Sequence, residues 1–119
     1  MDLDIACHIN VLVDGPDSPL TPQALLRVAE AGYRRIVLAP FDPAATDLAS
    51  LRRLFEDAGL TPIPIAGQMP GADVSSADAD ERRAGEAALY AMVDATAALG
   101  GDQLNGVPYG VFGHPMAPV

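Results

Sequence analysis

The chain has 119 residues, half of them hydrophobic, and a formal charge of −9 from 16 acidic and 7 basic residues. This length suits one domain, residues 1–119, and the apolar content argues against disorder. The acidic balance argues against a nucleic-acid-binding surface and against attraction to an anionic membrane. Because the chain has one cysteine and an acidic amino terminus unlike a signal peptide, we expect a cytoplasmic protein.

Extended apolar segments alternate with helical ones along the chain. The predicted strands span residues 5–13, 36–39, 61–66 and 103–107. The predicted helices begin at caps and end at glycines: Thr21 to Gly32, Thr46 or Asp47 to Gly59, and Asp78 to Gly100. Asp78 and Glu81 have the spacing of a capping box. The run 36–39 is continuously apolar, which is typical of a strand buried on both faces of a parallel sheet.

The βαβαβαβ order predicts right-handed crossovers and a parallel α/β fold. Two architectures satisfy it: a small open, doubly wound sheet, or half of a (β/α)8 barrel. The sequence has no lysine, no G-x-G-x-x-G motif and no P-loop. This argues against nucleotide binding and leaves both architectures open.

The third strand carries an unusual pair of prolines. Pro62 and Pro64 are two residues apart, so their missing N–H groups would face the same neighbouring strand. We therefore expect one of the two ladders beside this strand to be weakened, either by a frayed strand entrance or by a shift of register.

Candidate binding residues cluster where the predicted strands end, because ligands of parallel sheets bind at the carboxyl ends of strands. His8 and Asn10 have the same parity in the first strand and should share a face; His8 is equally well explained as a buried, satisfied histidine. Gly67 and Gly106 fit either close approach of a substrate or plain turn chemistry. The acidic residues fit helix caps and solvated faces, and the sequence shows no metal-ligand spacing and no catalytic pair of carboxylates.

Three segments give the chain a resemblance to a known family: 31–33 (Ala-Gly-Tyr), 72–78 (Ala-Asp-Val-Ser-Ser-Ala-Asp) and 105–110 (Asn-Gly-Val-Pro-Tyr-Gly). In their order and spacing they resemble the amino-terminal half of xylose isomerase-like TIM-barrel proteins, closest to the D-tagatose and D-psicose 3-epimerase group. The resemblance covers nearly the whole chain. It favours the half barrel, strands one to four of eight, over the open sheet.

The resemblance implies a substrate-binding set. His8 matches an aromatic residue that lines the family's sugar pocket, Gly67, Gly106 and Val107 match backbone or small-residue contacts, and Tyr109 matches an aromatic residue after strand four. There are departures: Val37 stands where many relatives have Glu, Asn105 replaces a Gly, and His8 is neither Phe nor Tyr. These departures leave the sugar undetermined.

The resemblance also implies a ketose 3-epimerase-type isomerase that moves a proton beside a carbonyl with the help of Mn or Mg. In the family the metal ligands and the acid-base glutamates lie on strands five to eight, so we expect this chain to bind no metal and to be inactive alone. The alternative is a non-catalytic half barrel that serves as an interaction module or binds a small molecule. For either we expect association, as a homo-oligomer or with a complementary half barrel, because half a barrel exposes two strand edges and an apolar face.

Overall fold

The computed structural model describes residues 4–11 and 20–114. Three helices, α1 (Pro22–Glu30), α2 (Leu48–Ala58) and α3 (Ala79–Ala98), alternate with strands. The strands are β1 (Ala6–His8), β2 (Arg35–Val37), β3 (Thr61–Ile63), β4 (Ile65–Gln68) and β5 (Asn105–Val111). Two short 3-10 turns, Ile9–Val11 and Pro43–Ala45, follow β1 and β2. Among the described residues, no helix is long and apolar enough to cross a bilayer.

All strand pairs are parallel. β1 pairs with β2 and β2 with β3, whereas β4 pairs with β5. Since β3 and β4 are separated only by Pro64, they are two parts of the predicted third strand, and β5 is the predicted fourth. The order along the sheet is therefore the sequence order, as in a barrel.

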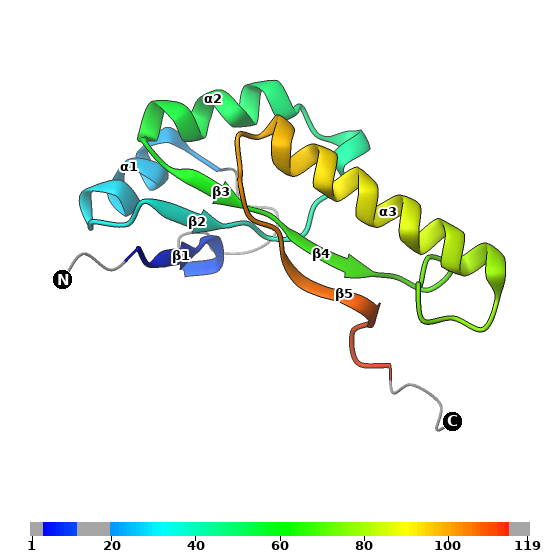
Figure 1. The fold of residues 1–119 in the computed structure, drawn as a ribbon. Helices are drawn as coiled ribbons and strands as arrows, with labels where there is room; N and C mark the ends of the chain where they lie inside the picture. Colours follow the sequence, from blue (N-terminus) through cyan, green and yellow to red (C-terminus); the bar gives the residue numbers. More distant parts are fainter. Residues whose placement is uncertain (1–3, 12–19, 115–119) are drawn as a thin grey trace.

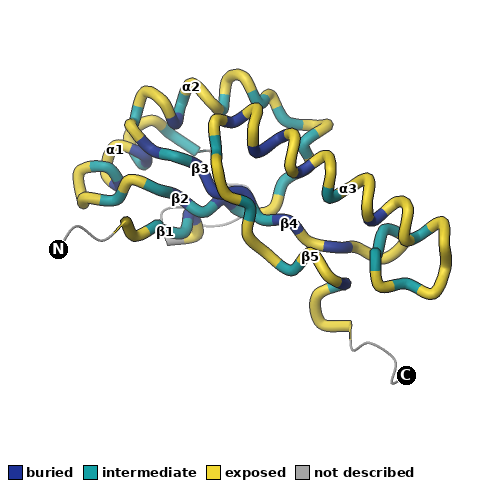
Figure 2. Tube along the Cα trace, viewed as in Figure 1, coloured by how far each residue is buried: buried dark blue, intermediate teal, exposed yellow. Residues whose placement is uncertain are grey.

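The helices settle the choice between the two architectures. Figure 1 shows α1, α2 and α3 together on one side of the strands. The core lies between them and the sheet, where Leu25 of α1, Ile36 of β2 and Phe55 of α2 are at most 1% exposed (Figure 2). Since a doubly wound sheet carries helices on both faces, this one-sided layer is that of a half barrel. The open, doubly wound alternative is wrong.

Successive side chains of a strand point to opposite faces of the sheet, so the residues on the face without helices can be identified. Ile36 belongs to the helix-side core, so Val37 points to the opposite face, together with its register partners His8 and Ile63. His8 and Val37 are half-buried, as is Val107 of β5. This face would be the inside of a complete barrel.

The predicted helix caps are present. The Thr21 hydroxyl accepts from the Ala24 N–H at 3.2 Å, and Asp47, rather than Thr46, caps α2. Asp78 accepts from the Asp80 and Glu81 N–H groups. Ser76 completes this cap in an unpredicted way, because its hydroxyl accepts from the Asp78 N–H and donates to the Glu81 carboxylate.

The two prolines weaken one ladder, as expected. Thr61 N–H donates to Arg34 and Ile63 C=O accepts from Leu38, so the ladder to β2 is intact. Pro62 and Pro64 face the other side, where pairing with β5 begins only at Ile65. Neither the frayed entrance nor a shift at the prolines describes the result, because the strand changes its partner at Pro64.

The first predicted strand is too long. β1 ends at His8, and Ile9–Val11 form a 3-10 turn. The Asn10 N–H donates to Nδ1 of His8 at 3.1 Å, a local bond that competes with the strand ladder. Residues 12 and 13, also assigned to this strand, lie outside the described part.

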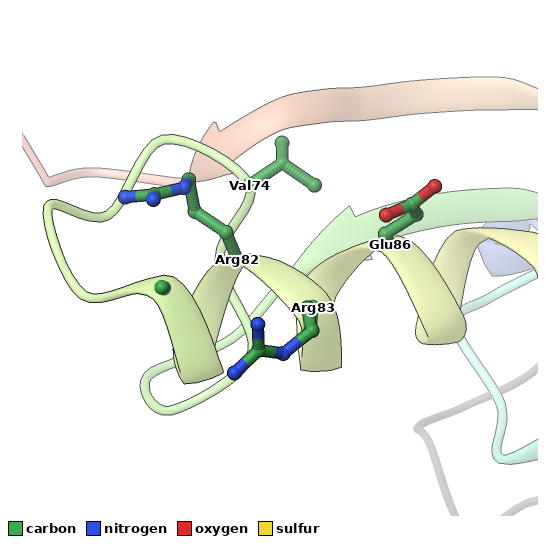
Figure 3. Close-up of a pocket in the computed structure, with 5 residues that line it drawn as sticks. Val74, Arg82, Arg83 and Glu86 are labelled. Atoms are coloured by element: carbon green, nitrogen blue, oxygen red, sulfur yellow. The ribbon is translucent and has the colours of Figure 1, made fainter.

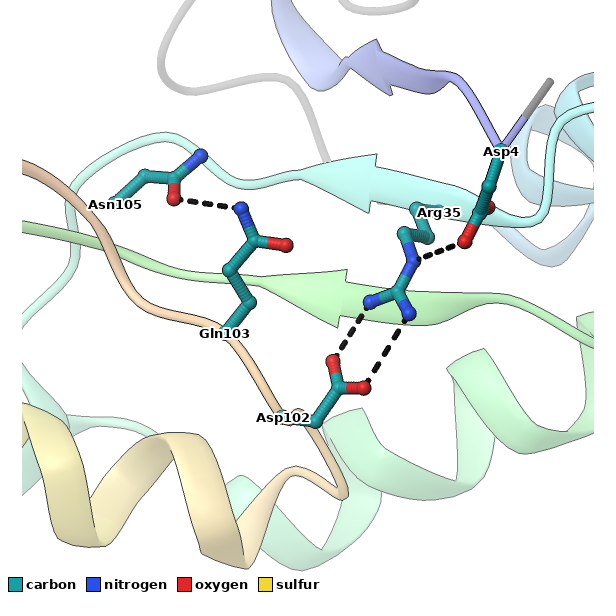
Figure 4. Close-up of polar contacts among 5 residues, drawn as sticks. All are labelled: Asp4, Arg35, Asp102, Gln103 and Asn105. Atoms are coloured by element: carbon teal, nitrogen blue, oxygen red, sulfur yellow. Dashed lines mark hydrogen bonds and ion pairs between the residues drawn. The ribbon is translucent and has the colours of Figure 1, made fainter.

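A charged cluster joins three strands at their amino ends (Figure 4). Arg35 of β2 donates through Nε to Asp4 at 2.9 Å and through both terminal nitrogens to Asp102, at 2.6 and 3.3 Å. Asp4 precedes β1 and Asp102 precedes β5, so the guanidinium reaches past β3. The hydrogen bonds and charge of Arg35 hold the pKa of Asp102 below its ordinary value.

This cluster predicts a pH-dependent contribution to stability. A carboxylate with a lowered pKa in the folded state stabilises the fold above its unfolded pKa, and this contribution is lost as the pH falls through the folded pKa. Arg35→Gln should lower the urea midpoint at pH 7, and the gap to the wild type should shrink toward pH 3. Arg52→Gln, which removes an exposed Arg52–Glu56 pair, is the control and should change little at either pH. If the difference in urea midpoint between Arg35→Gln and the wild type were the same at pH 7 and pH 3, the electrostatic explanation would be contradicted.

Two phenylalanines provide a matched test of the core. Phe55 is 1% exposed, whereas Phe112 is 84% exposed. Phe55→Leu leaves part of the core unfilled and should lower the free energy of unfolding by about 1 kcal/mol or more, whereas Phe112→Leu should stay within about 0.5 kcal/mol of the wild type. Chemical denaturation of both variants measures the difference, and equal losses would place the core elsewhere.

Candidate functional site

The carboxyl ends of the strands lie at one edge of the sheet, and the structure places His8 and Gly67 at or near such ends, in β1 and β4. Gly106 and Val107 lie instead near the start of β5, because this strand begins at Asn105 and extends beyond the predicted end at 107. Gly67 of β4 is the register partner of Val107 of β5, and Ala66 pairs with Gly106. The structure therefore brings Gly67, Gly106 and Val107 together. His8 ends β1 at the level of Ile63 in β3, two strands away along the sheet.

His8 is half-buried, and its ring is held by a hydrogen bond from the backbone two residues further along the chain. The Asn10 N–H donates to Nδ1, so a neutral ring carries its proton on Nε2 and can present that N–H as a donor. Asn10 itself is exposed in the 3-10 turn. The prediction that the two residues share one strand face is wrong, because the strand ends before Asn10; the turn links them through the Asn10 backbone.

A glycine is required at position 106 for a structural reason that is neither substrate approach nor turn chemistry, the two interpretations that the sequence offered. Its φ is +124°, and a Cβ added there would lie 2.0 Å from the carbonyl oxygen of Ala66. Only glycine lets β5 approach β4 so closely. Gly67 is different: it is exposed, and a Cβ there would meet nothing within 4 Å. Its missing side chain leaves open space at the sheet edge.

Tyr109 lies in an irregular stretch of β5. Gly67 pairs with Val107, but the next residue, Gln68, pairs with Val111, so residues 108–110 bulge out of the ladder. Tyr109 is 70% exposed. It lies in the carboxyl-terminal half of β5, whereas His8 ends β1, the outer strand of the other ladder.

Gln68 is a buried residue that sequence reasoning left outside the site. It is 6% exposed; its Oε1 accepts from the Val74 N–H at 2.7 Å, and its Nε2 donates to the carbonyl groups of Gly67 and Gly85. A Cβ on Gly85 would lie 2.5 Å from this Oε1 and 2.7 Å from the Val74 nitrogen. Gln68 thus ties the loop after β4 to α3, and the available signal was a glycine inside a long helix.

The same loop contains an internally bonded carboxylate. Asp73 accepts from the Ser75 hydroxyl at 2.7 Å and from its N–H at 2.8 Å, and these bonds lower the pKa of Asp73. The Asp73 N–H donates to the carbonyl of Glu81, which fixes the loop to the first turn of α3. The loop is therefore held from β4, from its own side chains and from the helix.

Metal-ligating side chains do not gather in the part of the chain that the structure describes. Within residues 4–11 and 20–114, no group of three His, Cys, Asp or Glu residues could hold a metal ion. Two surface hollows lie along α3: the first, shown in Figure 3, is lined by Arg82, Arg83 and Glu86, and the second includes Asp102 and Leu104 of the segment that leads into β5. What the edge offers is a histidine N–H donor, an open backbone at Gly67 and an exposed phenol.

The two glycines provide a test of this geometry. Gly106→Ala places a methyl group against the Ala66 carbonyl and should cost about 2–4 kcal/mol of stability, by strain and a weakened ladder. Gly67→Ala meets open space and should change stability by no more than about 0.5 kcal/mol. Urea denaturation of both variants checks this. Equal destabilisation would show that β5 does not approach β4 as described.

Comparison with known proteins gives two similar sequences. The chain is 28% identical over 116 residues to a ketose 3-epimerase from Arthrobacter globiformis, covering 98% of this chain and 40% of the relative. It is 32% identical over 96 residues to an L-ribulose 3-epimerase from Methylomonas sp. (strain DH-1), covering 81% of this chain and 34% of the relative. No family model matches.

Solved structures agree. A D-allulose 3-epimerase from Methylomonas sp., in complex with D-allulose, superposes with a TM-score of 0.77 at 26% identity, covering 97% of this chain and 41% of that one. An L-ribulose 3-epimerase gives 0.76 at 27% identity, with 97% and 39% covered. The chain thus spans about two fifths of the length of its relatives, which are ketose 3-epimerases, and this span is consistent with the amino-terminal half of their barrel.

Proposed function

We propose, from the relationship of this chain to the ketose 3-epimerases, that it forms the amino-terminal half of such a sugar isomerase and contributes one side of its substrate site. The observation that carries the proposal is the bare sheet face beside Gly67 and Val107, in a chain whose relatives act on ketoses. One cysteine in 119 residues suits a cytoplasmic setting.

The residues at the edge suit a polyhydroxylated ligand. Gly67 offers its backbone without a side chain in the way, and the Nε2–H of His8 can donate to a hydroxyl or carbonyl oxygen. Tyr109 and Val107 present a phenol and an apolar surface to the carbon skeleton of a sugar. We assign these residues, with Gly106 and Asn10, to the sugar-binding side of the site.

Catalysis needs more than these residues. Exchange of a proton at the carbon beside a carbonyl requires a positioned base and, for inversion, an acid on the opposite face. The described residues do not fit the divalent metal that such a barrel is expected to use, because no three ligating side chains come together. We propose that the metal ligands and the acid-base groups come from outside this half barrel.

A non-catalytic half barrel that binds a partner is the second candidate. The half-buried inner face and the unpaired outer edges of β1 and β5 favour it. We propose that two copies, or this chain and a complementary half, join along these edges. Sedimentation equilibrium at micromolar concentrations should show a species larger than 12 kDa, whereas a concentration-independent monomer would overturn the association.

A chimera tests the sugar site. The 119-residue chain alone should not turn over D-fructose, D-psicose or D-tagatose, with or without Mn or Mg. Joined to the part of the Arthrobacter globiformis enzyme that follows the matched region, it should gain epimerase activity.

In that chimera, His8→Ala and Tyr109→Ala should each raise KM about tenfold or more without lowering the melting temperature. Leu26→Ala, an exposed position on α1, is the control. Turnover by the chain alone would overturn the proposal that the catalytic groups come from outside this half barrel. Unchanged KM values would overturn the assignment of His8 and Tyr109 to the sugar site.

A further inference from the structure

The bulge of β5 presents Tyr109 without support from the strand ladder. The register with β5 shifts between Gly67 and Gln68, and residues 108–110 are left without a partner in β4. Tyr109 itself is 70% exposed, so its side chain packs on little. A strand segment that is not bonded into its ladder keeps its place only if other contacts hold it. The position of the Tyr109 phenol therefore depends on what holds its neighbours.

Gly110, the last residue of the bulge, is buried against the loop that follows β4. A Cβ added to Gly110 would lie 3.3 Å from the hydroxyl oxygen of Ser75 and 3.8 Å from its Cβ. Apart from the chain neighbours of Gly110, no other residue that the structure describes comes within 4 Å of that position. Ser75 is therefore the side chain that covers this side of the bulge.

Asp73 holds Ser75 in this position. One carboxylate oxygen, Oδ1, accepts from the Ser75 hydroxyl at 2.7 Å and from the Ser75 N–H at 2.8 Å. These two bonds lower the pKa of Asp73 most, and the backbone N–H of Val111 and the charge of His114 lower it further. The carboxylate thus faces the end of β5, and it acts on the bulge through Ser75 at Gly110 and directly at Val111.

The loop can support the bulge because α3 fixes it from the other side. The buried Gln68 side chain accepts from the Val74 N–H at 2.7 Å and donates to the Gly85 carbonyl of α3. The Asp73 N–H donates to the Glu81 carbonyl, also in α3, at 3.0 Å. The loop is therefore tied to a long helix at the two residues that precede Ser75.

We propose that Asp73 is a positioning residue of the sugar site, which through Ser75 holds the bulge of β5 and so fixes where Tyr109 is presented. The inference rests on the proposed function, which assigns Tyr109 to the sugar. Asp73 bonds to Ser75 and to the backbone and need not touch the ligand. A bare backbone at Gly110 suits this contact, because a side chain there would press on the Ser75 hydroxyl.

NMR relaxation of the backbone amides tests the contact on the chain itself, without a sugar. In Asp73→Ala the order parameter of the Tyr109 amide should fall from about 0.85 to below about 0.6, the change from a rigid to a flexible backbone. Asp73→Asn should keep the wild-type value, because its amide oxygen can still accept both bonds from Ser75. Circular dichroism checks that both variants fold.

Adjacent serines provide the matched control. The Ser75 hydroxyl lies against Gly110, whereas the Ser76 hydroxyl accepts from the Asp78 N–H and donates to Glu81 at the start of α3. Ser75→Ala should therefore lower the order parameters of the bulge. Ser76→Ala should leave them unchanged, although it removes a helix-cap contact.

Kinetics in the active chimera test the role toward the sugar. Asp73→Ala should raise KM about threefold or more and leave kcat within about twofold, since it loosens a binding residue and no reacting group. Asp73→Asn should restore the wild-type KM. In a Tyr109→Ala background, Asp73→Ala should raise KM no further, because the residue through which it acts is gone. A general loss of structure would raise KM in both backgrounds.

Three results would overturn the proposal: an unchanged order parameter at Tyr109 in Asp73→Ala, an equal fall in Ser76→Ala, or equal KM increases in the wild-type and Tyr109→Ala backgrounds. If the chimera were inactive, the proposed function would be overturned, and the role of Asp73 toward the sugar with it. A lowered order parameter would still support Asp73 as the residue that holds the bulge, so the two failures are distinguishable.

Discussion

The position of all three helices on one face of the sheet is the constraint on which the rest of the structure depends. Right-handed crossovers between neighbouring parallel strands put each helix on the same side. Leu25, Ile36 and Phe55 are then buried between the two layers, and the alternate positions of the same strands are left on a face without helices. The composition of that face follows from this arrangement.

The two ends of the strands have different roles. At the amino ends, Arg35 joins the segments before β1 and β5 through ion pairs with Asp4 and Asp102. At the carboxyl ends, nothing among residues 4–11 and 20–114 fills the space where a Cβ of Gly67 would lie, and the His8 ring accepts a hydrogen bond from the nearby Asn10 N–H. In barrels generally, one end contributes stability and the other contributes binding.

Patterns with a local cause could be predicted from the sequence, whereas features that depend on distant partners could not. The caps at Thr21, Asp47 and Asp78 and the effect of Pro62 and Pro64 follow from single residues and their own backbone. The early end of β1 is an exception, since the bond from Asn10 to the His8 ring is local and was not predicted; the bond from Gln68 to Gly85, by contrast, joins residues 17 positions apart. The site was only partly accessible for the same reason: the glycine at 106 was recognisable, but its close approach to Ala66 needed the pairing of two strands 40 residues apart.

The change of partner at Pro64 divides the hydrogen-bonding of the sheet into two blocks. β1, β2 and β3 share one ladder, and β4 and β5 share another, with α3 attached to the second through Gln68. Cooperative opening of a protein follows contiguous bonded units. The second block is held to the first by the chain at Pro64, by the Arg35–Asp102 ion pair and by Leu99, which lies in the same buried cluster as Phe55. Side-chain packing and one ion pair therefore hold the half of the sheet that carries Gly67 and Val107 in place where the backbone ladder is interrupted.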